Sequence, residues 1–352
     1  MGSILVEKRS FGRRFHSGKG GSRQTRCWSQ TPVRRFTDHM NSRDVPCSRG
    51  GDHLWAVTAY FNPMRYRRKR FNYQLFRECL GVPLVAVELA YGADFELAEA
   101  DAEILVKLRG RDVLWQKERL LNIALQALPS SCRKVAWVDC DVIFENNDWP
   151  QRTSMLLDAF TMVQPFSHVH WMPPDWESGR ELLPDGQLRA VPLLIAAGMP
   201  VGTCLGTPAS QSQCSCGYAW AANRALLEKN KLYDACIVGG GDSAMVRAAY
   251  GRFEDALRLQ ALNRDHYLNW AIPFHNAVHS DVGFVEGAIF HLWHGKPGDR
   301  RYRERNDGLR RFQFDPLSDV AIDQNGVWRW NSDKPEMHDF VRDYFFLRRE
   351  DG

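Results

Sequence analysis

The chain has 352 residues, of which 44% are hydrophobic and 12% aromatic, which is enough apolar surface to bury a large core and excludes a wholly disordered protein. Its net charge of +4 is unevenly distributed, because residues 1–37 hold nine basic residues against the single acid Glu7, which leaves the remainder at −4. A mildly acidic body gives no reason to expect a nucleic acid as partner.

The apolar runs and the cysteines of the sequence indicate the cellular compartment of the protein. No apolar run reaches the ~20 residues that a membrane-spanning helix needs, and the N-terminal region lacks the apolar core of a secretory signal. The nine cysteines are an odd number spread over a long chain, which favours reduced thiols. We therefore expect a cytoplasmic protein without a transmembrane segment.

Residues 1–50 are rich in Arg, Ser and Gly and have no sustained apolar period, so we predict a disordered basic leader. Arg- and Ser-rich leaders that lack acids resemble organelle transit peptides, and an extension of the reading frame upstream of Met40 is the alternative. Either way, the expected folded domain comprises residues 51–352.

From residue 54 onward, short β-rich apolar runs alternate with segments of helical period. Strands are predicted at residues 54–60, 83–89, 104–108 and 135–138, and helices at residues 68–80 and 115–128. This order is typical of the α/β class, with a mostly parallel central sheet flanked by helices and a Rossmann-like nucleotide-binding half at residues 51–150.

The pattern is less regular in the second part of the chain, residues 151–352. The long stretch at residues 168–216 has no clear period, and we expect it to form either a loop that covers a substrate or a segment packed on the surface. The predicted elements are a helix at 153–160, a strand at 162–166, an irregular stretch at 168–216, helices at 218–229 and from 239, a strand running into a turn at 288–295, and a terminal helix at 336–349.

Two carboxylates, Asp139 and Asp141, directly follow the apolar run at residues 135–138. In an open α/β sheet the carboxyl ends of strands bind ligands, and charged groups there are costly unless they are paired. Mg²⁺ and Mn²⁺ prefer oxygen ligands and leave positions open for phosphate, so this pair suits a metal that holds a diphosphate. The alternative is a polar turn after a strand.

Two histidines, His291 and His294, lie three residues apart at the end of the predicted strand near residue 290. Side chains alternate along a strand, so the two rings would face opposite sides if the strand continues through both, and only one would face the aspartates. His294 precedes Gly295, where the backbone can turn, and is the favoured third metal ligand. His291 is the second choice, because it lies deeper in the apolar run.

Two further segments suit an anionic ligand. Three consecutive glycines at residues 239–241 leave backbone N–H groups accessible at a predicted helix start. The segment after His294 is strongly basic and would neutralise phosphate charge beside a metal, or else form a solvated loop. Its basic residues include Lys296, Arg300, Arg301, Arg303 and Arg305.

Together these segments resemble glycosyltransferases of the GT-A fold, in particular members similar to glycosyltransferase family 2 and the C-terminal part of the galactosyltransferases. The resemblance runs from about Leu54 to the end of the chain. The motifs that carry it are Asp139-Cys-Asp141, the helix at 115–122 before it, residues 217–224 followed by 239–242, and His291-Leu-Trp-His-Gly295.

The resemblance implies a mechanism. The Asp-x-Asp motif would hold Mn²⁺ or Mg²⁺ on a nucleoside-diphosphate sugar, a later histidine would complete the coordination, and Asp242 would be the catalytic base of an inverting enzyme. The galactosyltransferases carry a run of acids where this chain has only Asp242. The residues implied in donor binding are Ala59, Tyr60, Asn62, Arg68, Lys117 and Asn122.

The expected function is that of a metal-dependent, inverting glycosyltransferase of hexosyltransferase type, which transfers a sugar to a hydroxyl of a glycan or another acceptor. Residues 151–352 would form the acceptor-binding half. One alternative is a sugar-phosphate nucleotidyltransferase, although the first strand lacks the Gly-rich basic signature of that class. Another is a non-catalytic module that binds nucleotides or glycans.

A variant that begins at Gly51 should fold and retain full donor binding, because the composition of residues 1–50 offers no means of burying apolar surface. Soluble yield and nucleotide affinity of the shortened and full chains are the measurements. Loss of soluble protein would show that the leader is part of the folded structure.

Overall fold

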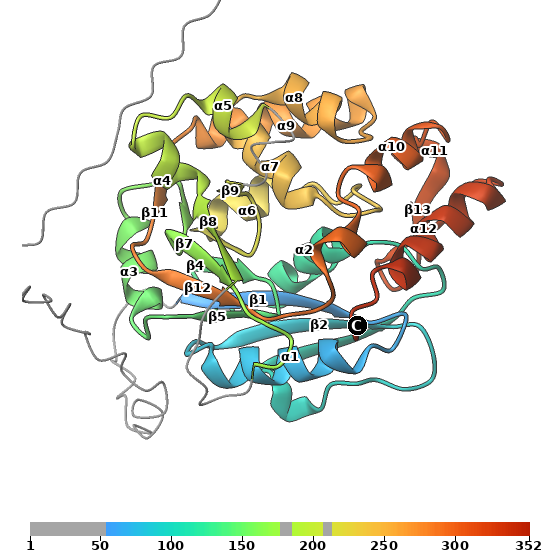
Figure 1. Cartoon of the computed structure of the whole chain (residues 1–352), viewed down its shortest axis with the longest axis horizontal. Helices are drawn as coiled ribbons and strands as arrows, with labels where there is room; N and C mark the ends of the chain where they lie inside the picture. The colour runs from blue at the N-terminus through green and yellow to red at the C-terminus, as the bar shows by residue number, and fades with distance from the viewer. Residues whose placement is uncertain (1–53, 177–184, 207–212) are drawn as a thin grey trace, which may run out of the picture. The chain divides into compact units, whose positions relative to one another are not determined.

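The computed structural model describes residues 54–176, 185–206 and 213–352 (Figure 1). The predicted leader lies outside the described residues. A seven-stranded sheet has the strand order β11-β6-β10-β4-β1-β2-β3. Its strands are β1 (Leu54–Phe61), β2 (Leu84–Ala90), β3 (Ile104–Arg109), β4 (Lys134–Val138), β6 (Met162–Gln164), β10 (Ala219–Asn223) and β11 (Val282–Phe284).

This sheet is mostly parallel. β1 pairs in parallel with β2 and β4, β2 pairs in parallel with β3, and β11 pairs in parallel with β6. Only β10 runs antiparallel to its two neighbours, β4 and β6. The predicted α/β class with a mostly parallel sheet flanked by helices is therefore confirmed.

The helices α1 (Arg67–Cys79) and α2 (Lys117–Ala127) cover opposite faces of the sheet. Successive side chains of a strand point to opposite faces, so Val57 of β1 packs with Leu121 of α2, and Ala56 packs with Phe76 of α1. Both faces of the sheet are buried, which is why these strands are continuous apolar runs in the sequence.

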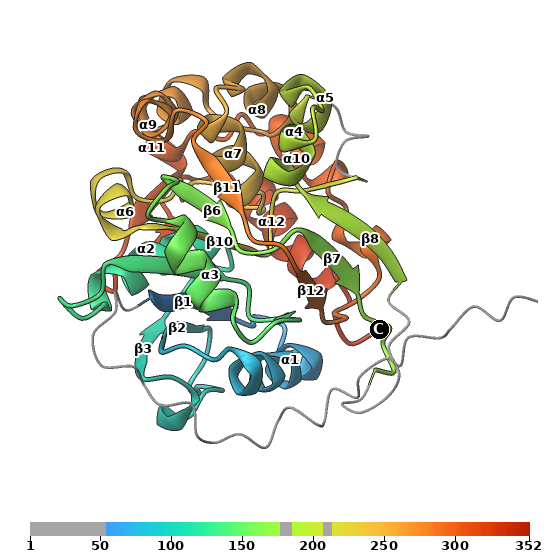
Figure 2. The same cartoon turned by 90° about the vertical axis from the view of Figure 1, so that its left-hand side faces the viewer.

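A second sheet of five strands, in the order β5-β12-β7-β8-β9, lies beside the first (Figure 2). Its strands are β5 (Val142–Phe144), β7 (His168–Trp171), β8 (Asp185–Ala190), β9 (Cys214–Ser215) and β12 (Ala288–His291). β12 runs antiparallel to β5 and places His291 opposite Val142. A segment near residue 291 thereby reaches the end of β4.

The remaining elements are further helices and a separate two-stranded sheet. They are α3 (Trp149–Leu156), α4 (Val191–Ala196), α5 (Val201–Leu205), α6 (Arg224–Asn230), α7 (Gly241–Ala249), α8 (Phe253–Leu259), α9 (Arg264–Val278), α10 (Glu304–Arg310), α11 (Pro316–Asp319), α12 (Pro335–Leu347), the short helices η2 (Glu99–Asp101) and η4 (Pro297–Arg300), and the pair β13 (Val320–Ile322) and β14 (Trp328–Trp330). Among the described residues, no helix is long and apolar enough to cross a membrane.

Three sequence predictions are wrong. The stretch at 168–216 is not irregular, since its described parts contain β7, β8, β9, α4 and α5. The helix predicted at 218–229 is preceded by β10, because pairing with both β4 and β6 outweighs the helical preference of its alanines. The helix predicted near 153–160 is present, but its bounds are wrong: it spans Trp149–Leu156, since Pro150 in its first turn favours an earlier start.

Candidate functional site

The turn after β4 carries Asp139 and Asp141, and backbone contacts hold it in place. The Thr58 hydroxyl donates to the Val138 carbonyl at 2.7 Å, and the Asp139 N–H donates to the Tyr218 carbonyl at 2.7 Å. The Leu292 N–H donates to the Asp141 carbonyl at 2.8 Å. The turn is thus tied to β1, to the segment before β10 and to the end of β12.

Lys117, the first residue of α2, joins two acids that lie far apart in the sequence. Its ammonium nitrogen lies 2.6 Å from a carboxylate oxygen of Asp139 and 2.6 Å from one of Asp242, in the first turn of α7. Burial alone would lower the pKa of Lys117, but the charges of Asp139 and Asp242 outweigh it and raise this pKa well above its usual value. Lys117 is therefore a cation at neutral pH.

A second cluster joins Asp141 to both histidines. The Nε2 atom of His294 lies 3.1 Å from one Asp141 oxygen, and that of His291 lies 3.7 Å from the other. The two Nε2 atoms are 3.1 Å apart, and the ligand atoms of all three residues lie within 4.8 Å of one another. One oxygen of Asp141 is buried without a hydrogen-bond partner. One carboxylate and two imidazoles converging on one point suit a metal ion.

The charge state of the histidines fits this use. Burial, together with the nearby charges of Arg300 and Arg348, lowers the pKa of His291 well below its usual value. Burial and Arg300 also lower the pKa of His294, to about 3, although Asp141 and Glu350 oppose the shift. Both rings are therefore neutral near pH 7, as metal ligation requires.

The expectation that only one histidine faces the aspartates is wrong. β12 ends at His291, so the alternation of a strand does not extend to His294. The segment after the strand is irregular, the Leu292 N–H donates to the Asp141 carbonyl, and both rings lie at the Asp141 side chain. Asp139, by contrast, lies outside this three-residue cluster, because its carboxylate pairs with Lys117.

Residues around the histidines complete the cluster. Glu350 forms a buried ion pair with Arg348 at 2.5 Å and lies 3.6 Å from the Nδ1 atom of His294. The ring of Tyr218 packs edge-on against His291, with centroids 4.8 Å apart. Sequence reasoning missed Glu350 and assigned no role to Tyr218 within the motif at 217–224, because no local pattern links either residue to a histidine elsewhere in the chain.

Three of the residues expected to bind the donor, Ala59, Tyr60 and Asn62, lie at the end of β1, and a fourth, Arg68, lies in α1. Tyr60, next to Ala59, hydrogen-bonds through its hydroxyl to Glu96, to which the amide of Asn62 also donates, at 3.0 Å. Arg68 of α1 donates to the Pro174 carbonyl at 2.9 Å. Asn62 lines a narrow pocket that extends to Arg348 and Glu350, the residues beside His294.

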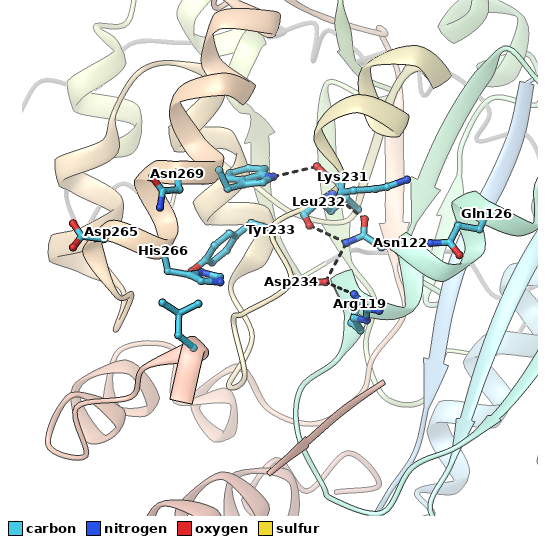
Figure 3. A pocket seen from close by; sticks show the side chains of 12 residues that line it. Arg119, Asn122, Gln126, Lys231, Leu232, Tyr233, Asp234, Asp265, His266 and Asn269 are labelled. Carbon is cyan, nitrogen blue, oxygen red and sulfur yellow. Dashed lines mark hydrogen bonds and ion pairs between the residues drawn. The ribbon is translucent and has the colours of Figure 1, made fainter. Parts of the chain in front are cut away.

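The structure does not bring Asn122 to this group. Its amide donates to the Leu232 carbonyl at 2.9 Å and its oxygen accepts from the Leu232 N–H at 2.8 Å. It lines a separate cavity of about 500 Å³ together with Arg119, Asp234 and His266 (Figure 3). Asn122 follows Lys117 by five residues, which turns it well away from Lys117 on a helix of 3.6 residues per turn.

Glu118 was also missed by sequence reasoning. It is buried, and a Cβ atom at Gly241 would lie 2.2 Å from its carboxyl group, so α7 begins directly against it. Burial raises the pKa of Glu118 to about 8; Lys117 opposes this rise and Asp242 adds to it. Glu118 is therefore mostly protonated at neutral pH and adds little negative charge to the site.

No family model matches the chain, and a search of curated proteins found no match. Among solved structures, the chain is similar to glucosyl-3-phosphoglycerate synthase from Mycobacterium tuberculosis in complex with UDP, at 13% identity and a TM-score of 0.39 over 80% of this chain and 87% of that one. The catalytic domain of Drosophila beta1,4-galactosyltransferase 7 matches at 12% identity and a TM-score of 0.27, over 58% and 62%. A 4-diphosphocytidyl-2C-methyl-D-erythritol synthase from Anaerococcus prevotii matches at 13% identity and a TM-score of 0.32, over 68% and 90%. These likenesses concern the fold, so the function is argued from the residues of the site.

Glu118→Gln should make stability less dependent on pH. The pKa of Glu118 rises from 4.5 to about 8 on folding, so the native state retains a proton that the unfolded chain releases. The resulting stabilisation is complete below the unfolded pKa and is lost as the pH rises to about 8. Glutamine does not ionise. The melting temperature of the variant minus that of the native protein should therefore increase as the pH rises from about 5 to about 8.

Thermal unfolding at several pH values measures this effect. Glu78→Gln, at an exposed position of α1, is the matched control and should keep a constant difference from the native protein. A constant difference for Glu118→Gln as well would contradict the prediction.

Proposed function

We propose that the protein is a metal-dependent glycosyltransferase that transfers a hexosyl group, with inversion, from a nucleoside-diphosphate sugar to an acceptor hydroxyl. The observation that carries the proposal is the convergence of Asp141, His291 and His294 at the carboxyl end of a parallel strand, beside an acid pair bridged by Lys117. Ligands bind at this edge of an open α/β sheet.

The metal site would consist of Asp141, His291 and His294. Two imidazoles favour a transition-metal ion over Mg²⁺, so of the two ions that the resemblance implies, Mn²⁺ is the better fit. When bound, the metal would stabilise the negative charge of the departing diphosphate. Arg300 lies beside this cluster, with a guanidinium nitrogen 2.8 Å from His294 Nε2, and would add positive charge on the diphosphate side.

Asp242 would act as the general base. It lies in the first turn of α7, directly after three glycines, where an acceptor can approach the backbone closely. The Lys117 ammonium nitrogen lies 2.6 Å from a carboxylate oxygen of Asp242 and so orients this carboxylate relative to the turn after β4. In an inverting transfer the acceptor oxygen attacks the anomeric carbon while its proton passes to the carboxylate.

Replacing either histidine, as His291→Ala or His294→Ala, should increase the Mn²⁺ concentration required for nucleoside-diphosphate binding, because each removes one ring from the cluster. Calorimetric titration across a Mn²⁺ series measures this requirement. His279→Asn is the control, since this exposed residue has a φ of 51° that asparagine tolerates. An unchanged requirement in both variants would remove the histidines from the metal site.

Asp242→Asn should lower kcat by about 10²–10⁴-fold and leave donor affinity nearly unchanged, the typical contribution of a positioned base. Release of nucleoside diphosphate from a panel of donors gives the rate, and the exposed Asp265→Asn provides the control. Loss of donor binding would make Asp242 a binding or structural residue. Retention of configuration in the product would contradict inversion, and release of pyrophosphate from a nucleoside triphosphate would indicate a nucleotidyltransferase.

A further inference from the structure

Arg305, in α10, is a buried cation without an acidic partner. Only 7% of the residue is exposed, and no ion pair is formed by it within the described part of the chain. One guanidinium nitrogen donates to the Tyr344 hydroxyl at 2.5 Å, while its Nε atom is buried with no hydrogen-bond partner. Arg348, close by, is by contrast neutralised by Glu350 at 2.5 Å. Buried charges are normally paired, so the site of Arg305 lacks an anion.

The environment of Tyr344 reports the same excess of positive charge. Burial alone would raise the pKa of this phenol, but the guanidinium groups of Arg305 and Arg348 outweigh it and lower the pKa below its usual value. The two acids near the start of α7 do not compensate Arg305. Asp242 is engaged by Lys117, and Glu118 is mostly protonated at neutral pH.

The Arg305 guanidinium points at the start of α7. Its nitrogens lie 3.1 Å from where a Cβ atom of Gly239 would stand and 3.6 Å from the corresponding position at Gly240. Both glycines have positive φ, 84° and 100°. At Gly239 the missing side chain lets the cation approach the backbone, whereas at Gly240 the Gln260 amide fills the corresponding space and donates to the Gly240 carbonyl at 2.7 Å. α7 has nine residues and no side-chain cap, so its first N–H groups have no intrahelical partner.

A second unsatisfied donor borders the same space. The ring of Trp115 lies 3.2 Å from the Cβ position of Gly239, and its buried Nε1 atom has no hydrogen-bond partner. A buried cation, an unpartnered indole N–H and an uncapped helix start therefore meet next to Asp242. Together they form a site for a carboxylate or phosphate group.

Two ligands could supply that anion, the donor diphosphate and the acceptor. Arg300, and not Arg305, contacts the histidine cluster, where the diphosphate would bind. Arg305 instead adjoins the glycines that immediately precede the residue assigned as the base. The position of Arg305 therefore favours the acceptor.

We propose that the acceptor carries a carboxylate or phosphate group, which Arg305 and the start of α7 bind while Asp242 faces the reacting hydroxyl. This inference rests on the proposed function. The hydroxyl oxygen forms a bond to the anomeric carbon, the bond from that carbon to the diphosphate oxygen breaks, and the diphosphate leaves with the bonding electron pair. The hydroxyl proton passes to Asp242, so no further reactant is needed.

The test uses acceptors matched in their hydroxyl groups, namely a sugar and its phosphate, and a hydroxy acid and its methyl ester. The native protein should have a lower KM for the anionic member than for the neutral member of at least one pair. A preference within the sugar pair indicates a phosphate site, and a preference within the hydroxy acid pair indicates a carboxylate site. Arg305→Gln should raise KM for that acceptor by about 10–100-fold, the range for a lost charge-assisted hydrogen bond, with little change in donor affinity. Arg305→Lys keeps the charge and should restore part of the loss.

Two further variants separate the assigned roles. Arg300→Gln should weaken donor binding and leave the acceptor KM nearly unchanged, whereas Arg342→Gln, at an exposed position of α12, should alter neither. Preference of the native protein for neutral acceptors would overturn the inference, and so would equal loss of donor affinity in Arg305→Gln and Arg300→Gln.

Failure of the proposed function is distinguishable from failure of this inference. If no nucleoside-diphosphate sugar is turned over, the glycosyltransferase proposal fails. The anion site is then tested with inorganic phosphate and with acetate by calorimetry. Binding that is lost in Arg305→Gln and retained in Arg300→Gln would support the site, and binding of neither anion to the native protein would refute it.

Discussion

The ammonium of Lys117, held at 2.6 Å from both Asp139 and Asp242, is the interaction on which the site depends. It joins the start of α2, the end of β4 and the start of α7, which come from widely separated parts of the sequence. A buried charge is costly unless it is paired, and removing one partner of such a group strongly destabilises the fold. The same constraint keeps Glu118 protonated where α7 packs against α2.

The pairing of β12 with β5 is the second constraint. It carries His291 to the end of β4, and because the strand ends there, His294 lies at the same point. Burial keeps both imidazoles neutral, which is the form that can bind a metal, and a metal at His294 Nε2 would take the place of the Arg300 guanidinium that contacts this atom at 2.8 Å. Glu350 pairs with Arg348 and lies against the Nδ1 atom of His294, whereas Asp141 lies on the side of the two Nε2 atoms.

Buried polar atoms without a hydrogen-bond partner lie close to the proposed metal site and to the proposed anion site. An oxygen of Asp141 and the Nε atoms of Arg300 and Arg305 are buried without hydrogen-bond partners. Native proteins rarely leave such groups unpaired unless a ligand, an ion or water completes them. A cation would satisfy the carboxylate oxygen, and anions would satisfy the guanidinium groups. A metal-bound diphosphate and an anionic acceptor would complement these charges.

The sequence by itself determined the α/β class, because continuous β-rich runs alternating with helical periods leave few other arrangements. It placed β1, β2 and β3 to within one residue at each end, and it selected Asp141, His291 and His294 as polar residues at the ends of apolar runs. Tertiary structure alone decided that residues 219–223 form a strand, because an alanine-rich segment takes its conformation from the strands on either side. It alone decided that His294 turns back to Asp141, that Asn122 faces a different cavity, and that Arg305 reaches the start of α7. These outcomes depend on contacts between residues far apart in the chain, which no local period encodes.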